Sequence, residues 1–218
     1  MHCLMLACCL SPLTTGLYEK ERLMSGRTLH ERGSNFFLQD ARDAHTLMEH
    51  LSFPKYSVMG WCDGGVAGMF LSSAFPQAAR NLVAWGCKSF ITDEDVELFE
   101  QVRDITTWNV EVSKPLAKEY GQEGFQALWS NWMDCILEFK EDHGGDICTE
   151  ELHKIACPTL LLHGAKDPLV PGIHPEYLRE HVRGSRLEVF EEGKHNIHLR
   201  YHEQFNAIVD RFLQNGDH

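Results

Sequence analysis

The stretch Gly60-Trp61-Cys62-Asp63-Gly64 constrains the fold of this chain more than any other, because it joins a short apolar run to a run with a helical pattern. A sharp turn from strand to helix crowds the two backbones, so small residues are needed two positions before and two positions after its tip. Gly60 and Gly64 meet that need and leave Cys62 at the tip. This spacing is typical of a nucleophile elbow.

A cysteine at the tip of such a turn has two interpretations. A thiol is intrinsically a better nucleophile than a hydroxyl, and the N-terminus of a helix favours its thiolate form. The neighbouring Asp63 acts in the opposite direction, because a nearby carboxylate disfavours a thiolate. The alternative is a buried structural cysteine that follows a strand, and the motif alone leaves that alternative open.

Apolar runs bounded by turn residues alternate with helical patterns along most of the chain. Such alternation predicts an α/β fold with a mostly parallel sheet and helices on both of its faces. Strands are expected at 56–61, 81–86, 158–164 and 186–190, and helices at 36–51, 63–74, 175–182 and 201–213.

Two segments depart from this alternation of strands and helices. Residues 88–150 are helical in pattern and carry many charges, with Thr92 and Asp95 spaced as a helix cap, so we expect a helical insertion between strands. Residues 1–33 have no clean period, and we expect a poorly ordered leader that is neither signal peptide nor membrane anchor, ahead of a domain at 34–218. One apolar stripe of the insertion is expected to pack as core: Phe125, Leu128, Trp129, Trp132, Ile136 and Phe139.

Charge and cysteine content restrict the partners and cofactors. A formal net charge of -12 disfavours nucleic acid and anionic membranes and favours cationic ligands. The eight cysteines have irregular spacing, so we expect reduced thiols in an intracellular protein. An alternative zinc site of Cys135, Cys148, Cys157 and nearby histidines lacks the spacing of structural zinc sites, and we expect neither metal nor cofactor.

Two polar residues follow predicted strands farther along the chain. Asp167 comes after the run at 158–164, and His195 comes after the run at 186–190. Taken singly, each also fits an ordinary turn or loop residue. Together with Cys62 they give the order nucleophile, acid, base, which is the chain order of the α/β-hydrolase triad.

From about residue 36 to about residue 214 the chain resembles the α/β-hydrolase family, and within it the serine hydrolases of α-amino acid esters. The motifs that carry this resemblance are GWCDGG, AWGCKSFITDED, LLHGAKDPLVP, HVRGSRL and EGKHNIHLR. The resemblance implies that Cys62 is the nucleophile, Asp167 the orienting acid and His195 the base. It also implies that the N–H of Asp63 contributes to the oxyanion hole and that its carboxylate binds the free α-ammonium of a small ester.

The same resemblance makes the block at about 88–150 a lid and points to the mitochondrion. We expect a monomer, located in the mitochondrion or the cytoplasm. The chain departs from the family pattern in two places. Cys62 replaces a serine, and residues 1–35 lack the HG-containing oxyanion loop and the D-x-R-G-x-G turn. We therefore expect the front strands to be missing, and one lost oxyanion donor costs about 10²–10³ in rate. The alternative function is a catalytically impaired or inactive hydrolase-like protein, either a pseudoenzyme or a truncated isoform, with a binding role or none.

Overall fold

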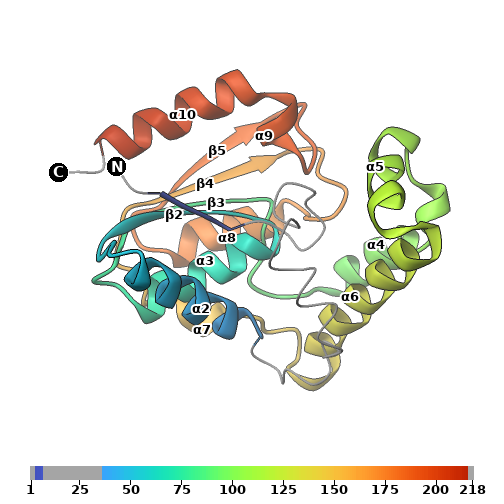
Figure 1. The fold of residues 1–218 in the computed structure, drawn as a ribbon, viewed down its shortest axis with the longest axis horizontal. Helices are drawn as coiled ribbons and strands as arrows, with labels where there is room; N and C mark the ends of the chain where they lie inside the picture. Colours follow the sequence, from blue (N-terminus) through green and yellow to red (C-terminus); the bar gives the residue numbers. More distant parts are fainter. Residues whose placement is uncertain (1–2, 7–35, 216–218) are drawn as a thin grey trace. The chain divides into compact units, whose positions relative to one another are not determined.

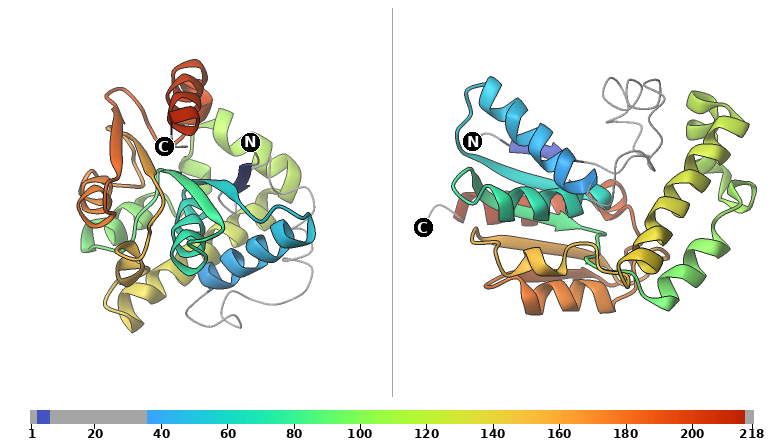
Figure 2. Two further views of the ribbon diagram at one scale, coloured as in Figure 1. Left: turned by 90° about the vertical axis from the view of Figure 1, so that its left-hand side faces the viewer. Right: turned by 90° about the horizontal axis from the view of Figure 1, so that it is seen from below.

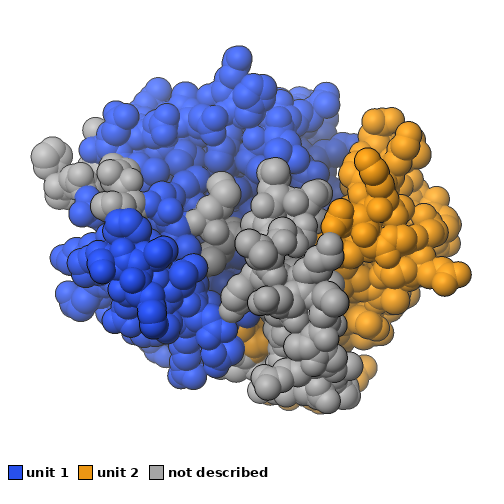
Figure 3. Space-filling model, in the orientation of Figure 1, with its two compact units in different colours: residues 1–8, 37–89, 148–218 blue, residues 9–36, 90–147 orange. Residues whose placement is uncertain are grey.

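The computed structural model of the chain describes residues 3–6 and 36–215 (Figure 1). The chain divides into two compact units (Figure 3). We call them the sheet unit, with residues 1–8, 37–89 and 148–218, and the helical unit, with residues 9–36 and 90–147.

The sheet unit is built on five parallel strands in the order β1-β2-β3-β4-β5. Because every pair is parallel, the carboxyl ends of all five strands lie at the same edge of the sheet, which is where ligands bind in such folds. The strands are β1 (Cys3–Leu6), β2 (Tyr56–Trp61), β3 (Ala79–Trp85), β4 (Thr159–Gly164) and β5 (Arg186–Phe190).

Strand β1 lies where the sequence predicts a leader without strands, and that prediction was wrong for these four residues. Cys3 pairs with Ser57 and Leu6 with Gly60. Four apolar residues carry no period that would mark them as a strand. They form one because the edge of β2 presents N–H and C=O groups that need partners. The rest of the predicted leader, residues 7–33, lies outside the described residues, and in the described part β1 is the one strand that precedes β2.

Helices cover both faces of the sheet, as the sequence predicts. On one face α3 (Asp63–Ala74) packs against β2 and β3, and α8 (Ile173–His181) against β4 and β5. Gly68 of α3 lets this helix approach closely, because a Cβ there would lie 3.2–3.3 Å from Leu82 and Val58. The left view of Figure 2 shows α10 (His202–Asn215) on the other face.

The core under α10 is apolar and continuous. Its members are buried side chains of β3, β4, β5, α9 (Ile197–Arg200) and α10, namely Val83, Trp85, Leu160, Leu162, Phe190, Ile197, Phe205, Val209, Phe212 and Leu213. The remaining helices of the sheet unit are α2 (Phe36–His50, of which Phe36 belongs to the helical unit) and α7 (Thr149–Leu152).

The helical unit contains α4 (Asp93–Gln101), the 3-10 turn η2 (Ile105–Thr107), α5 (Val110–Tyr120) and α6 (Gln122–Asp142). The predicted cap is confirmed, since the Thr92 hydroxyl accepts from the Asp95 N–H and the Asp95 carboxylate accepts from the Thr92 N–H. The apolar stripe of α6 is buried as expected, except that Leu128 is half-buried. The role of this block as a lid stays a prediction.

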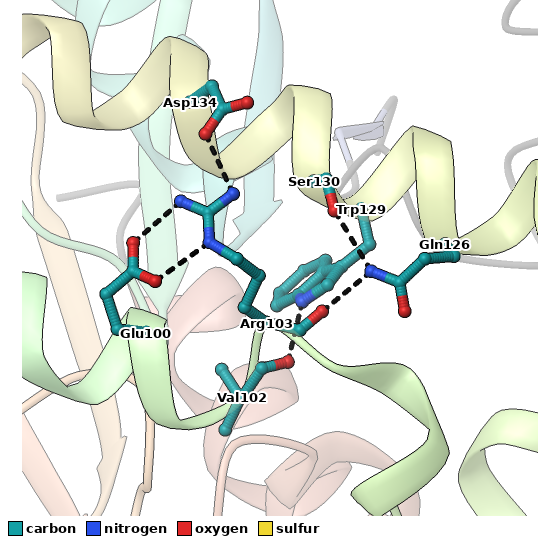
Figure 4. A network of polar contacts seen from close by, with 7 residues as sticks. All are labelled: Glu100, Val102, Arg103, Gln126, Trp129, Ser130 and Asp134. Atoms are coloured by element: carbon teal, nitrogen blue, oxygen red, sulfur yellow. Dashed lines mark hydrogen bonds and ion pairs between the residues drawn. The ribbon is translucent and has the colours of Figure 1, made fainter.

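A polar network fixes the end of α4 inside the helical unit (Figure 4). The carbonyl oxygen of Val102 accepts hydrogen bonds from the indole N–H groups of Trp108 and Trp129, each at 2.8 Å. Arg103 forms ion pairs with Glu100 and Asp134. Carbonyls at a helix end lack partners within the helix, and the two indoles supply them here. Among the described helices, none combines the length and the apolar character needed to cross a bilayer.

Candidate active site

Cys62 lies at the turn between β2 and α3 in a strained backbone conformation. Its φ is 56° and its ψ is -122°, a combination that residues other than glycine rarely adopt. Such strain costs about 1–3 kcal/mol and persists only where the surroundings fix it. Here the Cys62 N–H donates to the Trp85 carbonyl at 2.9 Å, and the Cys62 carbonyl accepts from Gly65 at 2.9 Å. The backbone therefore has the sharp strand-to-helix turn that the motif predicts.

The glycines around Cys62 are required by close contacts. A Cβ on Gly60 would lie 2.2 Å from the Gly64 carbonyl oxygen, so no side chain fits two residues before the tip. A Cβ on Gly65 would lie 2.9 Å from the Sγ of Cys87. The elbow can therefore form only with glycine at these positions.

Asp167 and His195 form the best-defined polar contact of this edge. The Nδ1 of His195 lies 2.8 Å from the Oδ2 of Asp167, whose side chain has no exposed surface. The other Asp167 oxygen accepts from the N–H groups of Leu169 and Val170 at 2.9 and 3.1 Å. An aspartate that accepts from Nδ1–H fixes the tautomer in which Nε2 is the basic nitrogen.

The pKa of Asp167 lies below its ordinary value. Burial by itself raises this pKa, but the charge of His195 and hydrogen bonds from His195 and the Leu169 N–H lower it by more. The carboxyl group is therefore ionised at neutral pH. An ionised, buried aspartate is suited to orient the imidazole of His195 and to stabilise its protonated form.

The loops that carry Asp167 and His195 touch each other through their backbones. A Cβ on Gly164 would lie 2.4 Å from the Lys194 carbonyl oxygen, and the Lys166 N–H donates to the Gly193 carbonyl at 2.8 Å. Gly86, at the end of β3, gives His195 its space, because a Cβ there would lie 3.1 Å from the His195 ring. Small residues at strand ends thus set the position of the imidazole.

Two indoles hold the His195 loop, and the sequence did not lead us to assign them a role. Trp61 Nε1 donates to the His195 carbonyl at 3.2 Å, and Trp85 Nε1 donates to Nδ1 of His198 at 3.0 Å. The ring of Trp61 lies against both imidazoles, with centroids 5.2 Å from His195 and 4.6 Å from His198. The sequence did contain an indication that these residues lie at the site, because Trp61 lies within the elbow motif and His198 follows His195 by one helical turn.

The imidazole of His198 is neutral in the folded protein. Its pKa is lowered to about 4, first by burial and then by the charge of His195. Because Nδ1 accepts the indole hydrogen, the proton of the neutral ring is on Nε2. The two histidines, three residues apart, thus differ in the partner of Nδ1, which is a carboxylate for His195 and an indole N–H for His198.

Lys88 is a further buried charge at this edge that the sequence analysis missed. It follows β3, is 8% exposed and donates from Nζ to the Leu169 carbonyl at 2.9 Å, which ties it to the loop of Asp167. A basic residue three positions after a buried strand is the signal that would have indicated it. Among the described residues, no group of three or more histidine, cysteine or acidic side chains is placed to hold a metal ion.

Asp63, the first residue of α3, lies beside the sulfur. The Sγ of Cys62 donates to Oδ1 of Asp63 over 4.0 Å. Cys62 itself is partly exposed, which disagrees with a fully buried structural cysteine. The structure therefore brings Cys62 and Asp63 together at the end of β2, and Asp167 and His195 together at the ends of β4 and β5, with the Trp61 indole joining the two groups.

Comparison with known proteins supports the same fold. No family model matches the chain. "Serine hydrolase BPHL" from Homo sapiens is 41% identical over 181 residues, which are 83% of this chain and 62% of that protein. "Pimeloyl-[acyl-carrier protein] methyl ester esterase" from Neisseria meningitidis serogroup B is 40% identical, over 73% of this chain and 69% of that protein. The enol-lactonase from Burkholderia xenovorans superposes with a TM-score of 0.67 at 14% identity, over 98% of this chain and 91% of that one.

The chain spans about three-fifths of the length of the human and mouse hydrolases that it matches. The solved structures share its architecture at identities well below 25%, so they bear on the fold alone. The name of the human and mouse relatives specifies a serine, whereas the elbow of this chain has Cys62 at its tip.

Proposed function

This chain belongs to the α/β-hydrolase family, and we propose that it hydrolyses small carboxylic esters with Cys62 as the nucleophile. The observation that carries the proposal is the 2.8 Å hydrogen bond between His195 and an ionised, buried Asp167, at the same sheet edge as a strained Cys62. The names of its relatives, a serine hydrolase and a methyl ester esterase, favour ester substrates.

The proposed reaction has two halves. In the first, Nε2 of His195 takes the thiol proton, Sγ of Cys62 attacks the ester carbonyl, and the alcohol leaves with that proton. In the second, water attacks the thioester, with His195 again acting as the base. The Asp63 N–H is the expected donor to the oxyanion, because the residue after the nucleophile supplies one of the two donors in this family.

We further propose that the preferred substrates are α-amino acid esters, whose α-ammonium binds the carboxylate of Asp63. Support comes from the position of this carboxylate, 4.0 Å from the sulfur, and from the net charge of -12, which attracts cationic ligands. The proposed partner is therefore a small cationic ester, handled by a monomer without nucleic acid or membrane.

The experiment is hydrolysis of valine methyl ester by the full chain and three variants. Cys62→Ala and His195→Ala are each expected to reduce kcat/KM by about 10³ or more, since each removes a member of the triad. Asp63→Asn is expected to reduce hydrolysis of the valine ester more than that of methyl 3-methylbutanoate, which lacks the amine. Circular dichroism and thermal unfolding verify that each variant folds.

Activity that persists in Cys62→Ala would contradict the nucleophile assignment. The second candidate function is a catalytically impaired member of the family, favoured by the cysteine in place of serine. Cys62→Ser is its test, because recovery of turnover in a folded variant would mean that only the thiol limits the native chain. If both chains fold and neither hydrolyses the ester, the site lacks more than a serine hydroxyl.

A further inference from the structure

The carboxylate beside the candidate nucleophile has an effect that depends on sulfur. A serine hydroxyl remains protonated at neutral pH whatever lies beside it, but a thiol ionises near pH 8.5 and responds to nearby charge. In this chain Sγ of Cys62 donates to Oδ1 of Asp63 over 4.0 Å. A carboxylate that accepts from the thiol stabilises the protonated form and repels the thiolate.

The size of the repulsion follows from the distance. Two unit charges 4 Å apart interact by an amount that corresponds to about fivefold in an equilibrium in water and about a thousandfold at an effective dielectric constant of 20. Asp63 begins α3 and is only partly buried, so the effect lies between these limits. We take about tenfold as the expected reduction of thiolate.

A second thiol responds to the same carboxylate. The pKa of Cys87 is raised to about 12, chiefly by burial, with further contributions from the charges of Asp167 and Asp63. His195 follows β5 at the same edge, and its ring lies against Trp61, the residue before Cys62. The charge on Asp63 therefore reaches a second thiol of this edge, and His195 keeps the role of base that the proposed function gives it.

We propose that Asp63 keeps Cys62 in the protonated thiol form until a small primary ammonium ion binds to the Asp63 carboxylate. This inference rests on the roles of Cys62 and Asp63 in the proposed function. It makes Asp63 a specificity-determining residue that acts on the nucleophile as well as on binding.

The sequence of events is a transfer of one proton without change of oxidation state. The bound ammonium donates its N–H groups to the carboxylate, compensates its charge and displaces the thiol from it. The thiol proton then passes to Nε2 of His195, which leaves a thiolate and an imidazolium that Asp167 stabilises. An ester with an α-ammonium thus converts Cys62 to the thiolate when it binds. A neutral ester binds while Cys62 is still a protonated thiol.

The test measures the thiolate directly and does not require turnover. The ultraviolet absorbance of the thiolate is titrated against pH in the full chain, and the titration of Cys62→Ser is subtracted so that only Cys62 contributes. Asp63→Asn is expected to contain about tenfold more Cys62 thiolate at pH 7, because it removes the charge. Asp63→Glu keeps the charge and is expected to titrate like the native chain.

The ligand probes are valine amide, which carries an α-ammonium and no ester, and 3-methylbutanamide, which has the same carbon skeleton without the amine. Valine amide is expected to increase the Cys62 thiolate of the native chain and to leave Asp63→Asn unchanged, and 3-methylbutanamide to change neither. An Asp63→Asn variant with no more thiolate than the native chain would overturn the proposal, as would equal effects of the two amides. Failure of ester hydrolysis would refute only the proposed function, since the thiolate signal does not depend on it.

Discussion

Each unit of this protein uses two indole N–H groups to hold a segment of chain in place. In the helical unit, Trp108 and Trp129 both donate to the carbonyl of Val102, directly after α4. In the sheet unit, Trp61 donates to a loop carbonyl and Trp85 to the imidazole of His198. The same donor therefore closes a helix end in one unit and positions titratable side chains in the other.

The comparison teaches that the indoles alone do not make a site. The helical unit has its positive φ angles at glycines, and its buried carboxylate, Asp95, caps α4. The sheet unit adds a positive φ at Cys62, which is not a glycine, and a buried Asp167 side chain paired with an imidazole. Strain and buried charge cost stability, and their concentration at one edge is typical of functional sites.

The largest expected effect is on stability and compares glycines of the two units. Gly60→Ala is expected to lower the free energy of unfolding by about 3 kcal/mol or more, because its Cβ would lie 2.2 Å from the Gly64 carbonyl oxygen. Gly124→Ala in α6 is the matched control, where a Cβ meets nothing within 4 Å. It is expected to stabilise by about 0.5–1 kcal/mol, as alanine does in a helix. Urea unfolding measures both, and equal effects would remove the distinction.

The next largest effect distinguishes the cost of backbone strain in stability from the cost of displacing His195 in activity. Gly86 and Gly144 have similar positive φ angles, 57° and 61°, but a Cβ meets the His195 ring only at Gly86. Alanine at either position is expected to cost about 1–2 kcal/mol of stability. Only Gly86→Ala is expected to reduce ester hydrolysis as well, by about a hundredfold, because small misplacements of a catalytic group are costly. A similar loss of activity in Gly144→Ala would contradict this.

Acid is expected to destabilise the sheet unit at a higher pH than the helical unit. The folded pKa of His198 is about 4 against 6.5 for the ordinary residue, so protonation favours the unfolded chain. The contribution of neutral His198 to the free energy of unfolding is complete above pH 6.5 and is lost as the pH falls toward 4. The loss is less than about 1.4 kcal/mol per pH unit, because the ring is partly exposed.

The pKa of Asp167 is also lowered, so its contribution is lost below the ordinary value of 3.8. The pKa of Glu100 in the helical unit is lowered by its hydrogen bond to Arg103 and matters only below 4.5. His198→Phe is expected to reduce the pH dependence of unfolding between pH 6.5 and 4, to which His163, whose pKa is also lowered by burial, still contributes. Glu100→Gln is expected to leave it intact, and an unchanged pH dependence in His198→Phe would contradict the assignment.

The smallest expected effect concerns the indoles themselves. Trp61→Phe removes the indole donor to the His195 carbonyl and is expected to cost about 1 kcal/mol. Trp129→Phe leaves Trp108 on the Val102 carbonyl, so about 0.5 kcal/mol is expected there. Thermal unfolding compares the two, and the ester assay adds a sharper distinction, since only Trp61→Phe touches the His195 loop.

Much of the sheet unit follows from local sequence. Strand β2 and helix α3 have the predicted bounds, because glycines and a buried apolar run leave few other conformations. Helix α8 begins at Ile173, two residues before its expected start, and strand β3 begins at Ala79 because it pairs with Tyr56 through an irregular register. Such boundaries depend on partners that a single segment does not reveal.

By itself, the sequence determined the strand-helix alternation, the elbow around Cys62 and the order in which Asp167 and His195 follow, since these depend on periodicity and on the steric freedom of glycine. Only the tertiary structure decided that Cys3–Leu6 is a strand, because an isolated apolar run gains hydrogen bonds only when a sheet edge is available. It likewise decided that His198 stays neutral beside His195, because burial and an indole donor far along the chain set its protonation.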